Sequence, residues 1–425
     1  MEEIITTNPL EDVAEKPLVE TPVLKKFTSY QVLVIALLAL TQFTVVLDFM
    51  VMSPLGDMLM KSMNLSTQQF AFAVSGYAFS AGISGFLTAG FADKFDRKKL
   101  LLFFYIGFIC GTLFCGLSHS YYMLLGGRII TGLFGGVIGS ISMAIVADLF
   151  PMEKRGRVMG FMQMGFGASQ VLGIPISLYI ANAWGWQSPF LMIVGLATIV
   201  WLLVMFKLEP INKHLAIKSD KNPLLHLWHT LSQKRYRVGF LAAAILSMGG
   251  FMMMPWGSAF AINNLKLTQQ QLVPLFMVAG VASLISMPLI GKYSDKINKF
   301  KMFVIASCWM IIMTLVYTNL TPVPLWVVMV LNILFMVGIL SRMVPAMALT
   351  SALPQMQDRG AYMSISSSLQ QFAGGAAAIV GGMIVVQKTK FSPLEHYNLL
   401  GLVLIGLGIV AIGLIYRVSK LVVKK

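Results

Sequence analysis

Twelve long apolar stretches divide this chain, and they constrain its fold more than any other feature. They lie near residues 30–60, 68–92, 99–118, 121–149, 156–183, 186–207, 237–262, 269–292, 300–319, 322–350, 360–387 and 395–418. Each is long enough for the roughly 20 apolar residues that cross a ~30 Å hydrocarbon layer as a helix. Because lipid offers no partner to backbone polar groups, such segments must be helical. The pattern predicts an all-α integral membrane protein with twelve transmembrane helices.

The scarcity of charge excludes a water-soluble globule. Charged residues make up 12% of the chain and hydrophobic residues 57%, whereas a soluble domain carries about 25% charged residues. The three cysteines fall inside apolar stretches and the five histidines show no ligand spacing, so we expect no metal site and no cofactor. The sequence shows no nucleophile–base pair and no nucleotide-binding motif, so we do not expect an enzyme or an ATP-driven pump.

The basic residues are distributed unevenly over the predicted loops. With the N-terminus inside, 26 of the 32 Lys and Arg residues lie on the inner side and four on the outer side. The positive-inside rule therefore places both termini in the cytoplasm. The net charge of +15 follows from this topology and the anionic inner leaflet, and not from nucleic-acid binding. We expect a multi-pass protein of a bacterial inner (plasma) membrane.

The chain also contains a repeat of about half its length. Four landmarks recur at offsets of 201 to 204 residues: Pro54 and Pro255, Asp93 and Asp295, Pro151 and Pro354, and the Arg-Gly pairs at 155–156 and 359–360. An internal repeat in an apolar chain is typical of secondary transporters. We therefore expect a cytoplasmic tail at 1–28, a six-helix bundle at 29–207, a cytoplasmic linker at 208–236, a second six-helix bundle at 237–418 and a cytoplasmic tail at 419–425. Within the linker, Leu224–Leu231 is predicted to form a short helix on the inner membrane face.

Several segments resemble the motifs of the major facilitator superfamily, and the likeness extends over about residues 30–418. The loop Ala89-Gly-Phe-Ala-Asp93-Lys94-Phe-Asp96-Arg97-Lys98-Lys99 is similar to the family signature Gly-x-Leu-Ala-Asp-Arg-x-Gly-Arg-Arg, with departures at Ala89 and Asp96. Leu124–Gly132 resembles the fourth-span motif of proton-coupled members, and Asp148–Gly156 resembles the exit from that span. Gly173-Ile-Pro175 matches the core of the fifth-span antiporter motif, and Gly185-Trp186 resembles the sequence that closes the connection after the fifth span. The resemblance implies two six-helix bundles related by pseudo-twofold symmetry, in a drug:proton antiporter or sugar-efflux-like subfamily.

The same resemblance implies a conformational latch in the cytoplasmic loops. Asp93 would face the N-terminus of the eleventh span, where the helix dipole is positive, and Arg97 would pair with Asp148 at the end of the fourth span. Arg155 belongs to the exit motif, and Asp295 occupies the position of Asp93 in the second half. The alternative is that this basic cluster only sets the topology.

Asp48 is the only one of the 17 acidic residues that falls well inside a span. A charge at that depth costs about 2.5–3.5 kcal/mol on insertion scales, so it is a functional hypothesis by default. Arg128 in the fourth span is its natural counter-charge, because the first and fourth spans line the central cavity in the family that the chain resembles. We predict that Asp48 and Arg128 couple transport to protons. A structural ion pair that never titrates is the alternative.

Other intramembrane residues are candidates for a substrate cavity. Arg342 lies near mid-membrane without an acidic partner in its own half, so an anionic substrate group or backbone carbonyls are its expected partners. Met-rich segments precede Pro54 and Pro255, and flexible thioethers suit varied apolar ligands, with simple packing as the alternative. The predicted cavity residues are Gln42, Met52, Gln163, Gln170, Met252, Trp256, Asn332, Arg342 and Gln370.

These patterns predict a secondary active transporter that works by alternating access about a midplane site. We expect proton-coupled efflux of a small apolar or amphipathic organic molecule, with Na⁺ as the alternative coupling ion. The nearest alternative function is an importer or facilitator of a small metabolite such as a sugar, nucleoside or organic anion. A membrane sensor or scaffold that binds a ligand without net transport is a third possible function. The expected partners are the small-molecule substrate, the coupling ion and membrane lipid, with no nucleic acid, and the expected state is a monomer.

Overall fold

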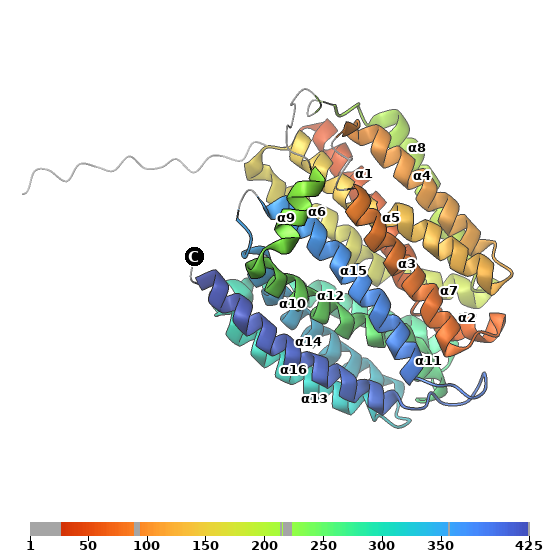
Figure 1. The fold of residues 1–425 in the computed structure, drawn as a ribbon. Helices are drawn as coiled ribbons and strands as arrows, with labels where there is room; N and C mark the ends of the chain where they lie inside the picture. Colours follow the sequence, from red (N-terminus) through yellow and green to blue (C-terminus); the bar gives the residue numbers. More distant parts are fainter. Residues whose placement is uncertain (1–26, 89–93, 213–214, 216–222, 356–357, 424–425) are drawn as a thin grey trace, which may run out of the picture.

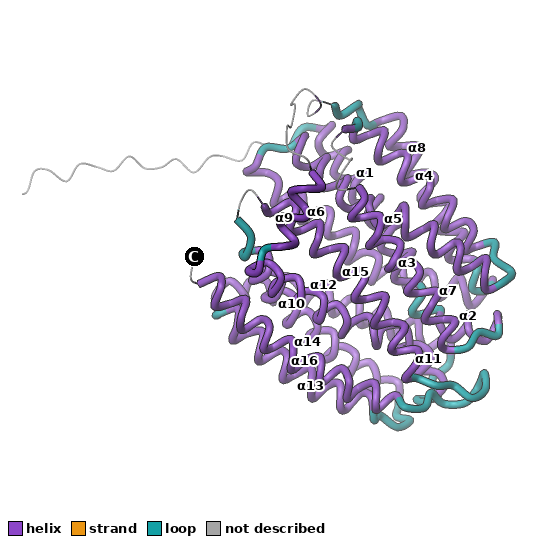
Figure 2. The backbone as a smooth tube through the Cα atoms, viewed as in Figure 1, coloured by secondary structure: helices purple, strands orange, loops and turns teal. Residues whose placement is uncertain are grey.

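Long helices that lie side by side form nearly all of the molecule (Figures 1 and 2). The computed structural model describes residues 27–88, 94–212, 215, 223–355 and 358–423. The helices in chain order are α1 (Ser29–Val51), α2 (Gly56–Met63), α3 (Thr67–Thr88), α4 (Arg97–Gly116), α5 (Tyr121–Leu149), α6 (Met152–Ala168), α7 (Ile174–Trp184), α8 (Ser188–Lys207), α9 (Pro223–Ser232), α10 (Lys234–Met253), α11 (Gly257–Asn263), α12 (Gln269–Lys296), α13 (Lys299–Thr318), α14 (Leu325–Ser351), α15 (Arg359–Ile384) and α16 (Tyr397–Val423).

Eleven helical segments among the described residues are long and apolar enough to cross a membrane. One of them runs from α6 into α7 through a π-helical turn, Ser169–Gly173, and another comprises α10 and α11. The predicted eleventh span, α15, is missing from this set because serines and two glutamines dilute its apolar residues. It has 26 residues and packs along both α3 and α10, so it takes the place of the twelfth helix in the bundle.

Matched prolines break the first and seventh spans at equivalent positions. Pro54 lies between α1 and α2, and Pro255 lies in a 3₁₀ turn, Met254–Trp256, between α10 and α11. Proline interrupts a helix because it lacks the N–H donor and its ring clashes with the preceding turn. The sequence repeat therefore appears in the structure as two matching helix breaks.

The loops at the two ends of the bundle differ in charge. Helices α4, α10 and α13 each have Lys or Arg residues in their first turn, and these starts lie at one end, which we call the basic end, together with α9. The short helices α2 and α11 lie at the opposite end, which we call the far end (Figure 1). The predicted linker helix is confirmed as α9, which packs against α15 and α10.

Candidate functional site

A buried ion pair joins two central helices in the first half of the chain. Arg128 Nη1 of α5 donates a hydrogen bond to Asp48 Oδ2 of α1 at 2.8 Å and lies 3.5 Å from the Asp48 carbonyl oxygen. The side chains of Asp48 and Arg128 are 0% and 1% exposed. The structure thus brings together the two residues that the sequence singled out for proton coupling.

Two further residues complete the surroundings of this ion pair, and the sequence analysis did not single them out. Thr112 Oγ1 of α4 donates a hydrogen bond to Asp48 Oδ1 at 3.1 Å. The ring of Tyr77 of α3 lies 4.7 Å from the Arg128 guanidinium carbon, within the range of a cation–π contact. Both are polar residues inside apolar stretches, which is the signal that could have identified them. Four different helices therefore hold one buried carboxylate and its cation.

A second ion pair lies at the basic end. Arg97 Nε donates to Asp148 Oδ2 at 3.1 Å, which links the start of α4 to the end of α5. Arg155 donates from Nε to the Phe150 carbonyl at 3.0 Å and from Nη2 to the Ala147 carbonyl at 2.6 Å. Arg155 therefore binds carbonyl groups that the last turn of α5 leaves without helical partners.

The other two residues of the predicted latch cannot be placed. Asp93 lies outside the described residues, and Asp295 lies on α12 with its side chain outside the described part of the chain. The contact of Asp93 with the eleventh span stays a prediction.

The predicted cavity residues fall into two groups by burial. Met52, Met252 and Trp256 are fully buried in the packed interior of the bundle. The half-buried residues are Gln42 on α1, Gln170 in the π-helical turn, Asn332 and Arg342 on α14, and Gln370 on α15. The side chain of Gln163 lies outside the described residues. Whether these half-buried polar residues line a substrate cavity stays a prediction.

Arg342 differs from Arg128 in its partners. Its guanidinium carbon lies 5.7 Å from the centre of the Phe303 ring, and its buried Nε has no hydrogen-bond partner. Among the described residues, no carboxylate forms an ion pair with it. A buried polar group without a partner is costly, and the binding of an anionic or strongly accepting group by Arg342 stays a prediction.

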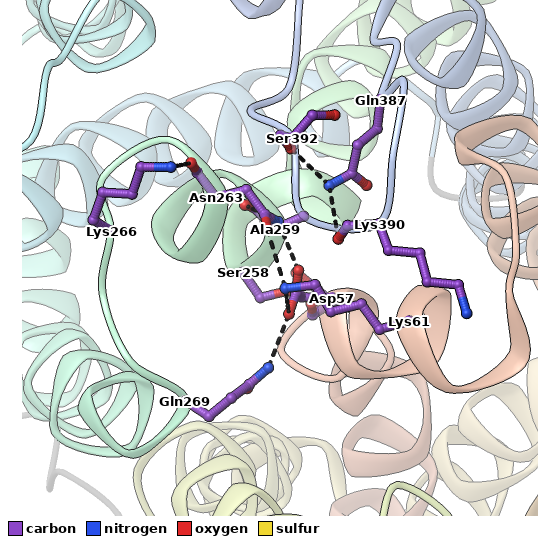
Figure 3. Close-up of polar contacts among 11 residues, drawn as sticks. Asp57, Lys61, Ser258, Ala259, Asn263, Lys266, Gln269, Gln387, Lys390 and Ser392 are labelled. Carbon is purple, nitrogen blue, oxygen red and sulfur yellow. Dashed lines mark hydrogen bonds and ion pairs between the residues drawn. The ribbon is translucent and has the colours of Figure 1, made fainter.

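The two halves of the chain meet at the far end around Asp57, a residue that the sequence analysis left without a role (Figure 3). The Asp57 carboxylate accepts hydrogen bonds from Asn263 Nδ2 at 2.6 Å and from Gln269 Nε2 at 2.9 Å, and pairs with Lys61 at 2.9 Å. Asp57 is 1% exposed. We call Asp57, Lys61, Asn263 and Gln269 the far-end junction.

Further contacts extend this junction. Lys61 Nζ also donates to Asn263 Oδ1 at 3.1 Å and lies 5.2 Å from the ring centre of Phe391. Ser258 donates to the Ser53 carbonyl at 2.7 Å, and Ser53 donates to the Met254 carbonyl. Lys61 and Asn263 are 202 residues apart, which is the repeat offset, so the repeat itself was the signal that could have predicted this contact.

Comparison with known proteins agrees with the fold and with the motifs. The family model of the Major Facilitator Superfamily matches residues 38–379. The chain is 26% identical over 262 residues to "Uncharacterized MFS-type transporter YceJ" of Bacillus subtilis, an alignment that covers 61% of this chain and 66% of that protein. It is 24% identical over 368 residues to a "Probable sugar efflux transporter" of Helicobacter pylori, covering 85% of this chain and 90% of that protein.

A solved structure shares the fold at low sequence identity. The crystal structure of a D-xylose-proton symporter superposes with a TM-score of 0.75 at 17% identity, covering 91% of this chain and 98% of that one. The family match covers most of the chain, and the bundle of long apolar helices agrees with it. The chain is therefore a multi-pass integral membrane transporter that belongs to the major facilitator superfamily.

Proposed function

We propose that this transporter couples the movement of protons to the export of a small apolar or amphipathic organic molecule. The observation that carries the proposal is the buried Asp48–Arg128 ion pair, which is fully enclosed by four helices. A carboxylate kept at this depth is costly and is retained in membrane proteins mainly for function. Asp48 would exchange one proton per cycle, because it is one carboxylate.

The chemistry of the pair supports an exchange between proton and substrate. In the ionised state, Asp48 balances the charge of Arg128 and accepts a hydrogen bond from Thr112. Protonation of the carboxylate would release Arg128 from its charge partner and change the polarity of the core around Tyr77. A substrate that binds better in one of these two states than in the other shifts the equilibrium between them, which is the requirement for coupling.

The conformational cycle would proceed by rocking of the bundles 29–207 and 237–418 about the midplane, with both termini in the cytoplasm. Under this orientation the far-end junction closes the outer side, because it ties the two halves together through Asp57. The Arg97–Asp148 pair, with Asp93 and Arg155, would act at the cytoplasmic side, as the family motif implies.

The proposal is tested by proton flux in proteoliposomes that hold a pH gradient. The native chain and Asp48→Asn are compared across a panel of lipophilic cations, sugars and organic anions. We expect substrate-triggered proton movement in the native chain and its loss, by at least tenfold, in Asp48→Asn. Glu395→Gln is the matched control, because Glu395 is an acidic residue in a surface ion pair with Lys388 and lies outside the core. Substrate flux without proton movement, unchanged in Asp48→Asn, would contradict coupling.

Arg342 favours a second candidate function. Its unpartnered Nε suits a facilitator or importer of a metabolite with an acceptor-rich or anionic group, such as an organic anion. Because relatives are named as sugar efflux transporters, the substrate panel includes sugars as well. In this case uptake of the metabolite would fall in Arg342→Gln and would be unaffected in Asp48→Asn.

A further inference from the structure

A lateral groove of about 390 Å³ lies where the linker helix α9 meets α10 and α15, close to the basic end. Such a volume is within the range of small-molecule sites. Its lining includes Trp228, Arg237, Phe240, Leu241, Ala244 and Leu369. None of the residues that line it is acidic.

Exposed apolar side chains lie on the wall of the groove and further along α15. Leu241 on its wall is 52% exposed. On α15, Val380 and Met383 follow Leu369 by 11 and 14 residues, spacings that return to nearly the same side of a helix. They are 39% and 59% exposed. Exposed apolar patches mark sites of membrane or protein contact, so these residues support an opening of the groove toward lipid.

The mouth of the groove has the residues that a phospholipid headgroup requires. Arg237 is exposed, and the one hydrogen bond that its guanidinium donates to a described residue is long, at 3.4 Å from Nε to the Leu231 carbonyl. Within the described part of the chain, no carboxylate forms an ion pair with Arg237. The exposed hydroxyl residue Ser232 lies beside it, and Trp228 is 67% exposed. Tryptophan at such a position is typical of the membrane interface.

We propose that this groove binds one anionic phospholipid. One acyl chain lies along Leu241, Ala244 and Leu369, and the phosphate is bound by Arg237 with Ser232. Basic pockets between helices on the cytoplasmic side select anionic headgroups through this combination of a cation and an apolar trough. Because α9 belongs to the connection between the two halves, the bound lipid contacts both the linker and the second bundle. The proposal does not depend on the direction of transport or on its coupling ion.

The test is native mass spectrometry of the full chain released from micelles that contain equal amounts of dioleoylphosphatidylglycerol and dioleoylphosphatidylcholine. We expect the native chain to retain one phosphatidylglycerol in preference to phosphatidylcholine. Arg237→Gln should reduce this preference about fivefold, the factor that corresponds to about 1 kcal/mol for one basic residue near an anionic lipid. Lys234→Gln is the matched control, because Lys234 is an exposed cation three residues earlier that does not line the groove.

A second variant tests the apolar part of the groove. Ala244→Phe adds a ring where the acyl chain would lie, so it should reduce the retention of both lipids, while thermal unfolding confirms that the variant is folded. Equal retention of the two lipids by the native chain would overturn the proposal. A preference for phosphatidylglycerol that persists in Arg237→Gln, or that is lost equally in Lys234→Gln, would also overturn it. Unchanged lipid retention in Ala244→Phe would do the same.

Discussion

The residues around Asp48 all come from the first half of the chain. Its cation is on α5, its hydroxyl donor on α4, and the aromatic ring beneath the cation on α3. Each of these contacts therefore lies within one half. A carboxylate in this setting is stable only while its charge is compensated, because the cost of burying an ion exceeds what one hydrogen bond returns.

Because Asp48 depends on charge compensation, removal of the Arg128 cation should destabilise the protein. Arg128→Gln leaves Asp48 buried without its partner and should lower the free energy of unfolding by about 3–5 kcal/mol. The double variant Asp48→Asn, Arg128→Gln leaves no charge in the core and should recover most of that loss. Thermal unfolding in detergent measures both losses, with Glu395→Gln, which removes a surface ion pair, as a neutral control. A double variant as unstable as Arg128→Gln would show that the uncompensated charge of Asp48 is not the cause of the loss.

At the scale of single helices, glycine determines how closely α5 approaches its neighbours. A Cβ on Gly132 would collide with the carbonyl oxygen of Tyr77 and with Ser80 Oγ on α3. A Cβ on Gly126, six residues earlier on the same helix, would meet nothing within 4 Å. Contacts between membrane helices depend on such small residues, because lipid provides no hydrophobic drive for helices to associate.

The two glycines make a matched pair of alanine substitutions. Gly132→Ala should lower the free energy of unfolding by about 1–3 kcal/mol, the usual cost of overpacking. Gly126→Ala should be neutral or stabilising by up to about 1 kcal/mol, because alanine favours the helix. Unfolding midpoints of the two variants, compared with the native chain under the same detergent conditions, measure the difference. Equal midpoints for the two variants would mean that α3 moves aside at negligible cost.

The elements themselves could be predicted from the sequence to within a few residues, because apolar length alone defines a spanning helix. The prolines Pro54 and Pro255 stood out in the repeat, but the breaks that they make in the first and seventh spans were not predicted. The π-helical turn Ser169–Gly173 could not be predicted, since nothing in local composition distinguishes it from regular helix. The polar character of Thr112 inside an apolar stretch marks it as a candidate, but the hydrogen-bond partners of Thr112 and Asp57 could not be predicted. Hydrogen bonds across helices depend on how the helices are rotated and packed.

For the whole molecule, the far-end junction connects the two halves through a charge. Asp57 is buried, and both of its amide donors, Asn263 and Gln269, come from the second half. A hydrogen bond to a charged group contributes about 1.5–3 kcal/mol. Two of them are enough to decide which of two conformations predominates, since about 1.4 kcal/mol corresponds to a tenfold change in population.

Removing both donors should therefore shift the molecule toward a state open at the far end. The variant carries Asn263→Ala and Gln269→Ala, with spin labels at Tyr122→Cys and Trp326→Cys in a background that lacks the three native cysteines. Both label sites are exposed, at 81% and 67%, and begin helices at the far end in opposite halves. Double electron–electron resonance should show a longer-distance population at least tenfold larger than in the labelled parent.

Glu395→Gln, which removes a surface ion pair within the second half, should leave the distances unchanged. If the distances are also unchanged in the double alanine variant, the junction does not hold the halves together. Apolar contacts between α3 and α15 would then keep the far end closed.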